Sequence, residues 1–377
     1  MTALARLELT ASGATSAITA GPDALVAQTA SLADWVGGGT LFIVSAQPIR
    51  ALHDARLDPL RRAIASNGGR CVELDVPDGE PAKDDVGEAS RLWNAMLAAG
   101  GRRDSRLLTF GGGTVGDLGG FVAGCFLRGI AYAQVPTTLL AQVDAAIGGK
   151  TGVDLAGGKN TVGLFHQPVQ VVADTHVLTT LDRDLLRAGL VEAIKMAYLL
   201  DLDLLARIER DLDLLLAGDV AALAPVVQGA AKAKVDVVLQ DEREGNLRRV
   251  LNFGHTLGHA IEADLGYADL SHGDAVAWGL RFALRLSRRR ALPRADADRL
   301  FDLIDRLGVP NLPPSVRAPT AVDRLLDLMQ NDKKATLRGL VWVLAKMAGT
   351  HEMADDVAPD AVRAELAAFL AEPTARA

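Results

Sequence analysis

Hydrophobic and polar positions divide the chain into two parts with different periods. Before about residue 180, short apolar and β-branched runs alternate with longer segments whose apolar residues recur at helical spacing. We interpret residues 40–45, 71–76, 106–110 and 131–135 as buried strands. We interpret residues 49–67 and 83–99 as helices. This alternation predicts a parallel sheet with helices on its faces.

After about residue 181 helical periodicity dominates. The predicted helices are residues 185–200, 202–216, 220–240, 257–265, 274–288, 295–307, 321–329 and 359–371. Residues 339–344 are the exception and are predicted to form a short strand. We therefore expect two domains, α/β over residues 1–180 and all-α over residues 181–377, with a ligand site in the crevice where they meet.

Composition narrows the class of protein. The chain has 377 residues, of which 49% are hydrophobic and 23% charged, so it can bury a core of ordinary size. Its net charge of −7 argues against nucleic acid as a partner. A small anionic ligand would need a local cluster of lysine and arginine.

The sequence shows no targeting signal, and we therefore expect the protein to be cytoplasmic. The N-terminus lacks the pattern of a signal peptide, and no apolar run reaches the roughly 18–20 residues that a membrane span needs. Two cysteines, Cys71 and Cys125, provide no disulfide framework, which fits a reducing compartment. We expect no membrane association.

A glycine-rich turn follows the third predicted strand. Gly111, Gly112 and Gly113 come directly after it and lead into a helix. Glycines at this point let the backbone approach a phosphate, and the helix N-terminus favours an anion. We expect a dinucleotide phosphate site here, although the same glycines could form an ordinary flexible turn. Asp117 is expected on the first helical turn, as a cap or as a partner of ligand hydroxyls.

Two Gly-Gly-Lys units lie close together further along the chain. They end at Lys150 and Lys159, and Asn160 follows the second. Lysines in glycine-rich loops can hold an anion, whereas a single lysine is usually a solvated surface charge. The proximity of Asp144 and the pair Thr137–Thr138 favours the binding site.

Histidines suggest a metal site. His255 and His259 are four residues apart and would share one face of a helix, while His272 and Glu192 complete a possible set of two histidines and a carboxylate. Spacing alone nominates His255 and His259 as the ligand pair. Ordinary core or surface histidines are the alternative.

Further basic residues accompany the histidines. Lys195 shares a helical face with Glu192 three positions earlier, and Lys234, Arg248 and Asn252 precede the histidines. Ion pairing within DEREGNLRR is a reasonable alternative for Lys234 and Arg248.

Taken together, these segments resemble the 3-dehydroquinate synthase family of sugar-phosphate cyclases. The resemblance runs from about residue 79 to residue 334 and rests on GGGTVGD, FLRG, VPTTLLAQVDAAIGGKTGVDL, GGKNTVGLFHQP, GLVEAIK, DEREGNLR, LNFGHTLGHAIE and HGDAVAWG. It implies an N-terminal Rossmann-like NAD domain, a C-terminal helical metal domain, and a small anionic sugar phosphate as the substrate.

The resemblance also assigns roles. The implied ligands of a divalent metal, zinc or cobalt, are Glu192, His255 and His272, which leaves His259 to handle substrate or a proton. The implied cofactor contacts are Glu80, Lys83, Gly112, Gly113, Asp117, Thr137, Thr138, Lys150, Lys159 and Thr180. The implied substrate contacts are Asp144, Lys150, Asn160, Lys195, Lys234, Arg248, Asn252 and His259.

The resemblance implies two further contacts. Arg128 resembles an arginine that reaches the substrate phosphate of a neighbouring subunit, which implies a homodimer. Lys333 or Lys334 resembles a lysine that meets the substrate carboxylate, with Lys334 preferred. One departure is visible, since Ser45-Ala46-Gln47 stands where the family carries a carboxylate for the adenosine ribose.

The implied activity is the conversion of 3-deoxy-D-arabino-heptulosonate 7-phosphate to 3-dehydroquinate and phosphate in the shikimate pathway, by a carbon–oxygen lyase. Three alternatives stay open: an aminodehydroquinate or valiolone-type cyclase, a metal-dependent alcohol dehydrogenase, and an NAD-binding sensor. The sensor would lack a metal ligand or a catalytic lysine, and none is missing.

Overall fold

The computed structural model describes residues 3–155, 158–330 and 340–372, which form two compact units. Unit 1 comprises Met1–Leu186 and Asp213–Glu242, and unit 2 comprises Arg187–Leu212 and Arg243–Ala377. The first crossing lies close to the predicted boundary at residue 180. The return of residues 213–242 to unit 1 was not predicted, because a helical pattern does not reveal which core its apolar face joins.

Unit 1 is built on a seven-stranded sheet of order β1-β2-β9-β6-β5-β3-β4. Its strands are β1 (Ala5–Ala11), β2 (Ala14–Gly21), β3 (Thr40–Ala46), β4 (Arg70–Val76), β5 (Arg106–Gly111), β6 (Tyr132–Pro136) and β9 (Gln170–Asp174). All neighbours are parallel except the β1–β2 hairpin. The four predicted strands are confirmed as β3 to β6, whereas β1, β2 and β9 were missed.

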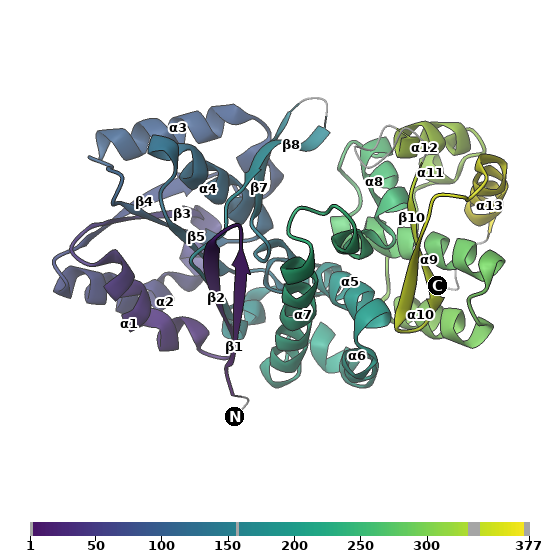
Figure 1. Ribbon diagram of the computed structural model, residues 1–377, viewed down its shortest axis with the longest axis horizontal. Coiled ribbons are helices and arrows are strands. Elements are labelled where there is room, and N and C mark those ends of the chain that lie inside the picture. Colours follow the sequence, from purple (N-terminus) through teal and green to yellow (C-terminus); the bar gives the residue numbers. More distant parts are fainter. Residues whose placement is uncertain (1–2, 156–157, 331–339, 373–377) are drawn as a thin grey trace. The chain divides into compact units, whose positions relative to one another are not determined.

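Helices cover both faces of the parallel part of this sheet (Figure 1). Alternate residues of β3 show the division, since Ile43 packs with α1 (Ala24–Val36) and α2 (Gln47–Ser66). Phe42 points the other way, toward α3 (Val86–Ala98) and α4 (Gly113–Cys125). The period-2 alternation of a strand buried on both faces thus gives two separate cores.

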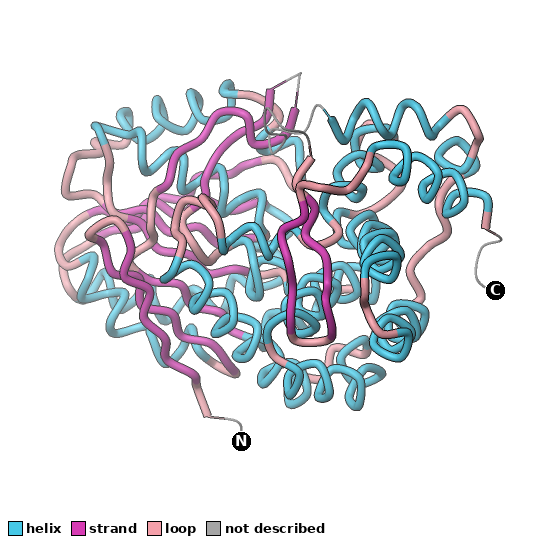
Figure 2. Tube along the Cα trace, turned by 45° about the vertical axis from the view of Figure 1, so that its right-hand side comes forward, coloured by secondary structure: helices cyan, strands magenta, loops and turns pink. Residues whose placement is uncertain are grey.

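Helix α7 (Val220–Gln240) is the segment of unit 1 that comes late in the sequence. Its apolar residues Ala231, Val235 and Val238 share a core with Leu9 of β1 and Ile18 of β2. In Figure 2 the chain leaves the N-terminus as the β1–β2 hairpin, which lies along the edge of the sheet. Burial of this apolar stripe explains why α7 belongs to unit 1.

Short elements of unit 1 carry many of the predicted site residues. They are η1 (Glu80–Lys83), η2 (Phe126–Arg128), the π turn η3 (Ala141–Ala145), the hairpin β7 (Lys150–Leu155) and β8 (Gly158–Phe165), and η4 (Thr175–Thr180). The single helix predicted over residues 83–99 is divided into η1 and α3. The first piece ends at Lys83, and Asp85 caps α3 by accepting a hydrogen bond from the amide of Gly87.

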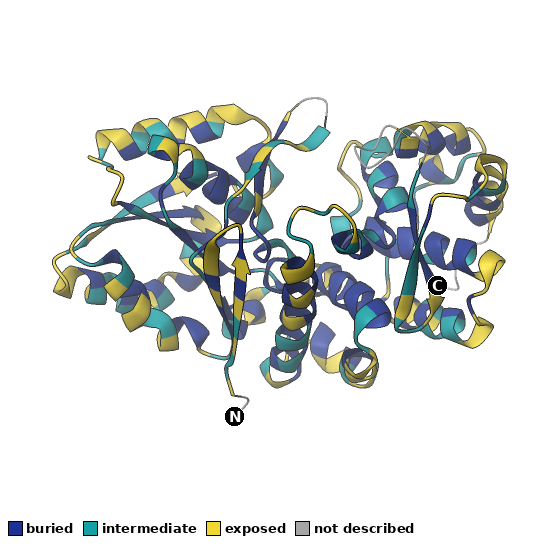
Figure 3. Cartoon of the chain, in the orientation of Figure 1, coloured by how far each residue is buried: buried dark blue, intermediate teal, exposed yellow. Residues whose placement is uncertain are grey.

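Unit 2 is mainly helical, as predicted. Its elements are part of α5 (Arg183–Leu200), part of α6 (Leu202–Leu216), η5 (Leu247–Asn252), α8 (His255–Asp264), α9 (His272–Arg290), α10 (Arg294–Leu307), α11 (Pro314–Arg317), α12 (Ala321–Gln330), β10 (Trp342–Met347), β11 (Thr350–Ala354) and α13 (Pro359–Ala371). The predicted strand over residues 339–344 is found as β10, paired with β11. Figure 3 shows α9 as a largely buried helix, and its apolar residues, including Phe282, lie in the main core of the unit.

Membrane association was not expected, and the part of the chain that the structure describes contains no helix that is long and apolar enough to cross a membrane.

Candidate active site

Three helices of unit 2 bring Glu192, His255 and His272 together. Glu192 lies in the middle of α5, His255 is the first residue of α8, and His272 is the first residue of α9. The Nε2 atoms of His255 and His272 lie 3.5 Å and 3.6 Å from Oε1 of Glu192. One nitrogen or oxygen from each residue lies within 4.8 Å of the others. This donor set is one that Zn²⁺ and similar cations accept.

Glycines allow the helices that carry the histidines to pack closely. A Cβ atom on Gly279 of α9 would lie 1.8 Å from the carbonyl oxygen of Gly254, the residue before α8. A Cβ on Gly258 would lie 3.1 Å from Cα of Val276. The two helices therefore meet backbone to backbone, which is possible only without side chains at these positions.

A buried ion pair fixes the start of α9 against α5. Arg187 donates to Asp274 with Nε–Oδ1 at 2.7 Å and Nη2–Oδ2 at 3.1 Å. Ser271 caps the helix by accepting from the amide of Asp274. Asp274 follows His272 by two residues, so the clasp holds the imidazole close to Glu192.

Charge is concentrated around Glu192. The carboxylate is fully buried and contacts the ammonium of Lys195, one turn along α5, which also donates to the carbonyl of Leu251. Burial by itself would lower the pKa of His272, but hydrogen bonds to Glu192 and Glu262 raise the pKa to about 10. A site with this much buried charge suits a charged ligand better than an apolar one.

His259 lies beside the same cluster without joining the first ligand set. Its ring centroid is 5.1 Å from that of His255 and 5.9 Å from that of His272. Among the described residues, the two possible ligand groups are Glu192–His255–His272 and His259–Glu262–His272. Neither contains both His255 and His259, so the pairing that spacing alone nominated is wrong. Helical spacing puts the two on one side of α8 but does not decide where each imidazole points.

Two more predicted residues lie in η5, just before α8. Arg248 is 2% exposed, and Asn252 donates its side-chain amide to the carboxylate of Glu244. Glu244 has a φ of 60°, a left-handed conformation that a non-glycine residue rarely adopts. The turn that precedes η5 therefore contacts Asn252 through Glu244.

In unit 1 the glycine turn connects β5 to α4 as predicted. Gly112 is the N-cap of α4, and a Cβ there would lie 3.1 Å from the methyl group of Thr138. A Cβ on Gly116 would lie 2.6 Å from the side-chain oxygen of Gln134, so α4 packs directly on the sheet. The prediction that Asp117 lies on the first turn is wrong. Helix α4 begins at Gly113, so its first turn ends before Asp117 and contains no acidic residue.

Asp117 instead belongs to a network around Lys83. The ammonium of Lys83 is 4% exposed and lies 3.2 Å from Asp117 Oδ2 and 3.0 Å from Asn160 Oδ1. Burial opposes the charge, yet Asp117, Glu80 and Asp154 raise the pKa of Lys83. Lys159 lies 3.3 Å from Glu80. Five predicted residues therefore meet in one place: Glu80, Lys83, Asp117, Lys159 and Asn160.

A second pair of a lysine and an aspartate lies in unit 1. Lys234 of α7 is 5% exposed and contacts both the carboxylate and the carbonyl of Asp144, which lies in the π turn η3. Gly148 and Gly149 follow at φ values of 103° and 69°, which glycine adopts at little cost. They lead to Lys150, the exposed first residue of β7.

The remaining predicted residues are more scattered. Thr137 is buried after β6, and Thr138 accepts from the amide of Ala141. Thr180 ends η4, and its hydroxyl lies 3.0 Å from Nε2 of the buried His53. Arg128 is exposed at a φ of 70°. Lys333 and Lys334 lie outside the described residues.

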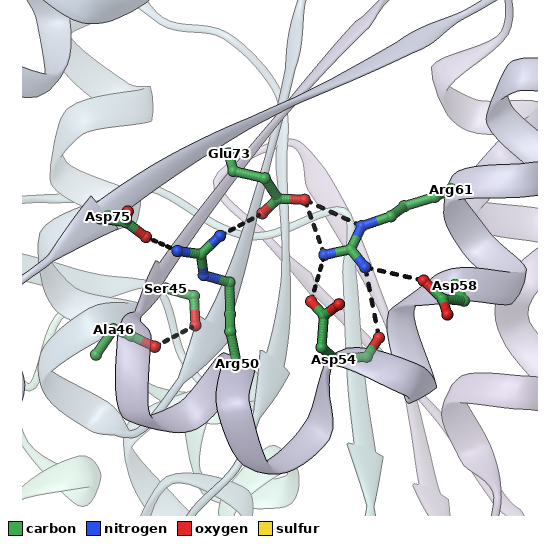
Figure 4. Close-up of polar contacts among 8 residues, drawn as sticks. All are labelled: Ser45, Ala46, Arg50, Asp54, Asp58, Arg61, Glu73 and Asp75. Carbon is green, nitrogen blue, oxygen red and sulfur yellow. Dashed lines mark hydrogen bonds and ion pairs between the residues drawn. The ribbon is translucent and has the colours of Figure 1, made fainter.

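Figure 4 shows the end of β3, where the departure from the family pattern occurs. The buried hydroxyl of Ser45 donates to the carbonyl of Ala46, and the pairing register places Asp75 of β4 opposite Ser45. Asp75 contacts Arg50, while Arg61 bonds Glu73, also of β4, at 2.9 Å. Ion pairs attach this edge strand to α2, and the carboxylates around the two arginines come from β4 and, as Asp54 and Asp58, from α2 itself.

Protein-family models and known relatives match most of the chain. A family model for the N-terminal part of 3-dehydroquinate synthase matches residues 73–188, and one for the C-terminal part matches residues 189–335. The chain belongs to the 3-dehydroquinate synthase family. A 3-dehydroquinate synthase from Rhodospirillum rubrum is 43% identical over 333 residues, covering 87% of this chain and 86% of the relative. One from Acidithiobacillus ferrooxidans is 38% identical over 347 residues, covering 92% and 93%.

A solved structure of another cyclase shares the fold. The 2-epi-5-epi-valiolone synthase of Streptomyces hygroscopicus, determined with NAD⁺ and Zn²⁺ bound, superposes with a TM-score of 0.82 and 26% identity, covering 96% of this chain and 98% of that one. Its identity is lower than that of the 3-dehydroquinate synthases. The predicted fold class is confirmed.

Two residues, one in each unit, were missed in the sequence. Asp154 accepts from the amide of Asn160 and lies 3.9 Å from Lys83, and Glu262 hydrogen-bonds His272. A signal for Glu262 was present, since positions 255, 259 and 262 share one helical face. Asp154 gave none, because hairpin contacts depend on register.

Proposed function

We propose that this member of the 3-dehydroquinate synthase family converts 3-deoxy-D-arabino-heptulosonate 7-phosphate to 3-dehydroquinate and phosphate as a carbon–oxygen lyase. The observation that carries the proposal is the convergence of Glu192, His255 and His272 in a chain matched by both family models. Identities of 38% and 43% to 3-dehydroquinate synthases, against 26% to the valiolone synthase, favour this substrate.

The donor sets fit the two cofactors that we propose. Glu192, His255 and His272 would hold a divalent cation, zinc or cobalt. The turn at Gly112 and the start of α4, with Lys83, Asp117 and Thr138 nearby, would hold NAD, because Gly112 and Gly113 place no side chain of their own at the N-terminus of the helix. When bound, the cation supplies Lewis-acid polarisation of a substrate oxygen and NAD supplies a reversible hydride acceptor.

The residues of the chain have separate tasks in this proposal. Lys150 and Arg248 neutralise the phosphate, Asn160 donates a hydrogen bond to it, and His259 moves a proton while the phosphate is eliminated. Lys234, fixed by Asp144, meets the substrate carboxylate. Lys195 lies against the carboxylate of Glu192 and holds it in place. Oxidation and reduction cancel over the cycle, so ring opening and an intramolecular aldol closure complete a redox-neutral reaction.

A phosphate-release assay tests the proposed function. Protein loaded with NAD⁺ and Zn²⁺ or Co²⁺ should release phosphate from the heptulosonate phosphate and yield 3-dehydroquinate. Release only from sedoheptulose 7-phosphate would reassign the protein to the valiolone synthases. Release only from the amino analogue of the heptulosonate would reassign it to the aminodehydroquinate synthases. His272→Ala should abolish turnover.

We also propose that the enzyme is a homodimer in which Arg128 reaches the phosphate of the neighbouring site. Its exposed, left-handed position at the end of η2 supports a role outside its own core. Mixing inactive Arg128→Ala and His272→Ala proteins should restore about a quarter of the activity, because one mixed site in each heterodimer has both residues. No recovery after subunit exchange would contradict the shared site.

A further inference from the structure

We infer that Glu262 is a positioning residue that fixes the tautomer and orientation of His272. This inference rests on the proposed function, because it takes His272 as a ligand of the cation. Neither the sequence motifs nor the proposed mechanism gives Glu262 a role.

The two ring nitrogens of His272 face different carboxylates. Its Nδ1 lies 3.1 Å from Oε2 of Glu262, and its Nε2 lies 3.6 Å from Oε1 of Glu192. An ionised carboxylate can only accept hydrogen bonds, so the bond to Glu262 keeps the imidazole proton on Nδ1. A cation that binds beside Glu192 would then displace the proton on Nε2 and leave the proton on Nδ1 in place. A ligating nitrogen is thus selected by the group on the far side of the ring.

His255 shows the same arrangement with a backbone acceptor. Its Nδ1 lies 3.3 Å from the carbonyl of Phe253, and its Nε2 lies 3.5 Å from Oε1 of Glu192. Both imidazoles therefore turn Nε2 toward one carboxylate oxygen. For His255 the turn before α8 provides the acceptor, and for His272, at the start of another helix, a side chain must do so.

The position of Glu262 fits this task. It lies on α8, seven residues after His255, and is only 5% exposed. Burying a carboxylate is unfavourable unless it is hydrogen-bonded, and the hydrogen bond to His272 offsets part of that desolvation cost. The second ligand group, His259–Glu262–His272, raises the alternative of another cation. That alternative is weaker, because His272 would have to lose both ring protons to bind a cation on each nitrogen.

Cobalt binding to the full-length protein tests the inference. Metal-free wild type, Glu262→Ala, Glu262→Gln and the control Asp264→Asn would be titrated with Co²⁺ alone, following visible absorption and competition with a chelator. Asp264 is a carboxylate on the same helix that pairs with Arg324 at 2.8 Å instead of with a histidine. Circular dichroism and the thermal midpoint would report that each variant is folded.

We expect Glu262→Ala to weaken Co²⁺ binding by about 10–100-fold and to change the visible spectrum. Glu262→Gln should be intermediate, since its amide oxygen still accepts from Nδ1, and Asp264→Asn should match wild type. If Glu262→Ala does not fold, the glutamine variant decides. Wild-type affinity and spectrum in both variants would overturn the inference alone. Loss of only a second equivalent of Co²⁺ would overturn it in favour of another cation site. Absence of Co²⁺ binding by wild type would instead reject the metal site of the proposed function.

Discussion

Buried lysines carry much of the charge at the residue scale. Lys83, Lys195 and Lys234 are 4%, 1% and 5% exposed, and each contacts a carboxylate. Removal of one partner from such a pair leaves the other charge buried, which costs more than the pair contributes in net stability. These positions should therefore respond to mutation very differently from surface lysines.

Lys234 and Lys232 provide a matched comparison on α7. Lys234→Met should lower activity by about 100-fold or more and the free energy of unfolding by about 1–3 kcal/mol, because Asp144 loses its partner. Lys232 is 63% exposed and pairs with Asp236, so Lys232→Met should leave both nearly unchanged. Phosphate release and urea unfolding measure the two effects. Equal effects of the two substitutions would contradict the proposal that Lys234 binds the substrate.

Helix packing places the ligands at the element scale. Glu192 lies within α5, whereas His255 and His272 begin α8 and α9, so their distances depend on how closely these helices approach. Gly254, Gly258 and Gly279 determine that approach.

Gly279→Ala tests the approach of α8 and α9. Alanine normally gains about 0.5–1 kcal/mol over glycine within a helix. Here the added Cβ would lie 1.8 Å from the carbonyl oxygen of Gly254, so the steric cost should win. We expect a lower thermal midpoint and weaker Co²⁺ binding, measured by calorimetry and titration. Arg288→Ala, an exposed position on the same helix, should change neither. A more stable Gly279→Ala protein would show that the helices can separate freely.

The attachment of α13 to α9 should depend on pH. Burial would raise the pKa of Glu365, but Arg285 and Arg289 lower it below its ordinary value of 4.5. A depressed pKa means that the stabilisation is present above that value and is lost as the pH falls through the lower folded-state pKa. Glu365→Gln should therefore lower the free energy of unfolding by about 1–3 kcal/mol at neutral pH. The difference from wild type should shrink in acid, whereas a difference that is constant with pH would argue for packing alone.

At the scale of the whole molecule, the two proposed cofactors concern different units. The proposed NAD contacts belong to unit 1, and the proposed metal ligands belong to unit 2. Ligands that bind the folded state stabilise the segments that they contact.

Hydrogen exchange should separate the two cofactors. Adding Zn²⁺ to the metal-free protein should slow exchange most in the peptides that contain Glu192, His255 and His272. Adding NAD⁺ should slow it most around Gly112 and the start of α4. Mass spectrometry of both states measures this pattern, and a metal effect confined to unit 1 would contradict the ligand assignment.

Periodicity and motifs determined much of this protein before any coordinates. The strands β3 to β6, the helices α6, α7 and α13, and the two-part fold class were all predicted, because apolar repeats of two or 3.6 residues are properties of the local chain. The site residues came from glycine, lysine and histidine motifs and the family resemblance that they support. Strand β9 was missed because its apolar run is short, whereas β1 was missed although its residues alternate between apolar and polar, which is a strand signal.

Tertiary structure alone decided which partners these residues have. Spacing paired His255 with His259, whereas packing turns Nε2 of His255 and Nε2 of His272 toward the same oxygen of Glu192. Lys83 meets Asn160, 77 residues away, and Lys234 meets Asp144, 90 residues away. Such contacts depend on how helices and sheets pack, because a side chain's position within its own helix or strand does not determine which distant group it will face.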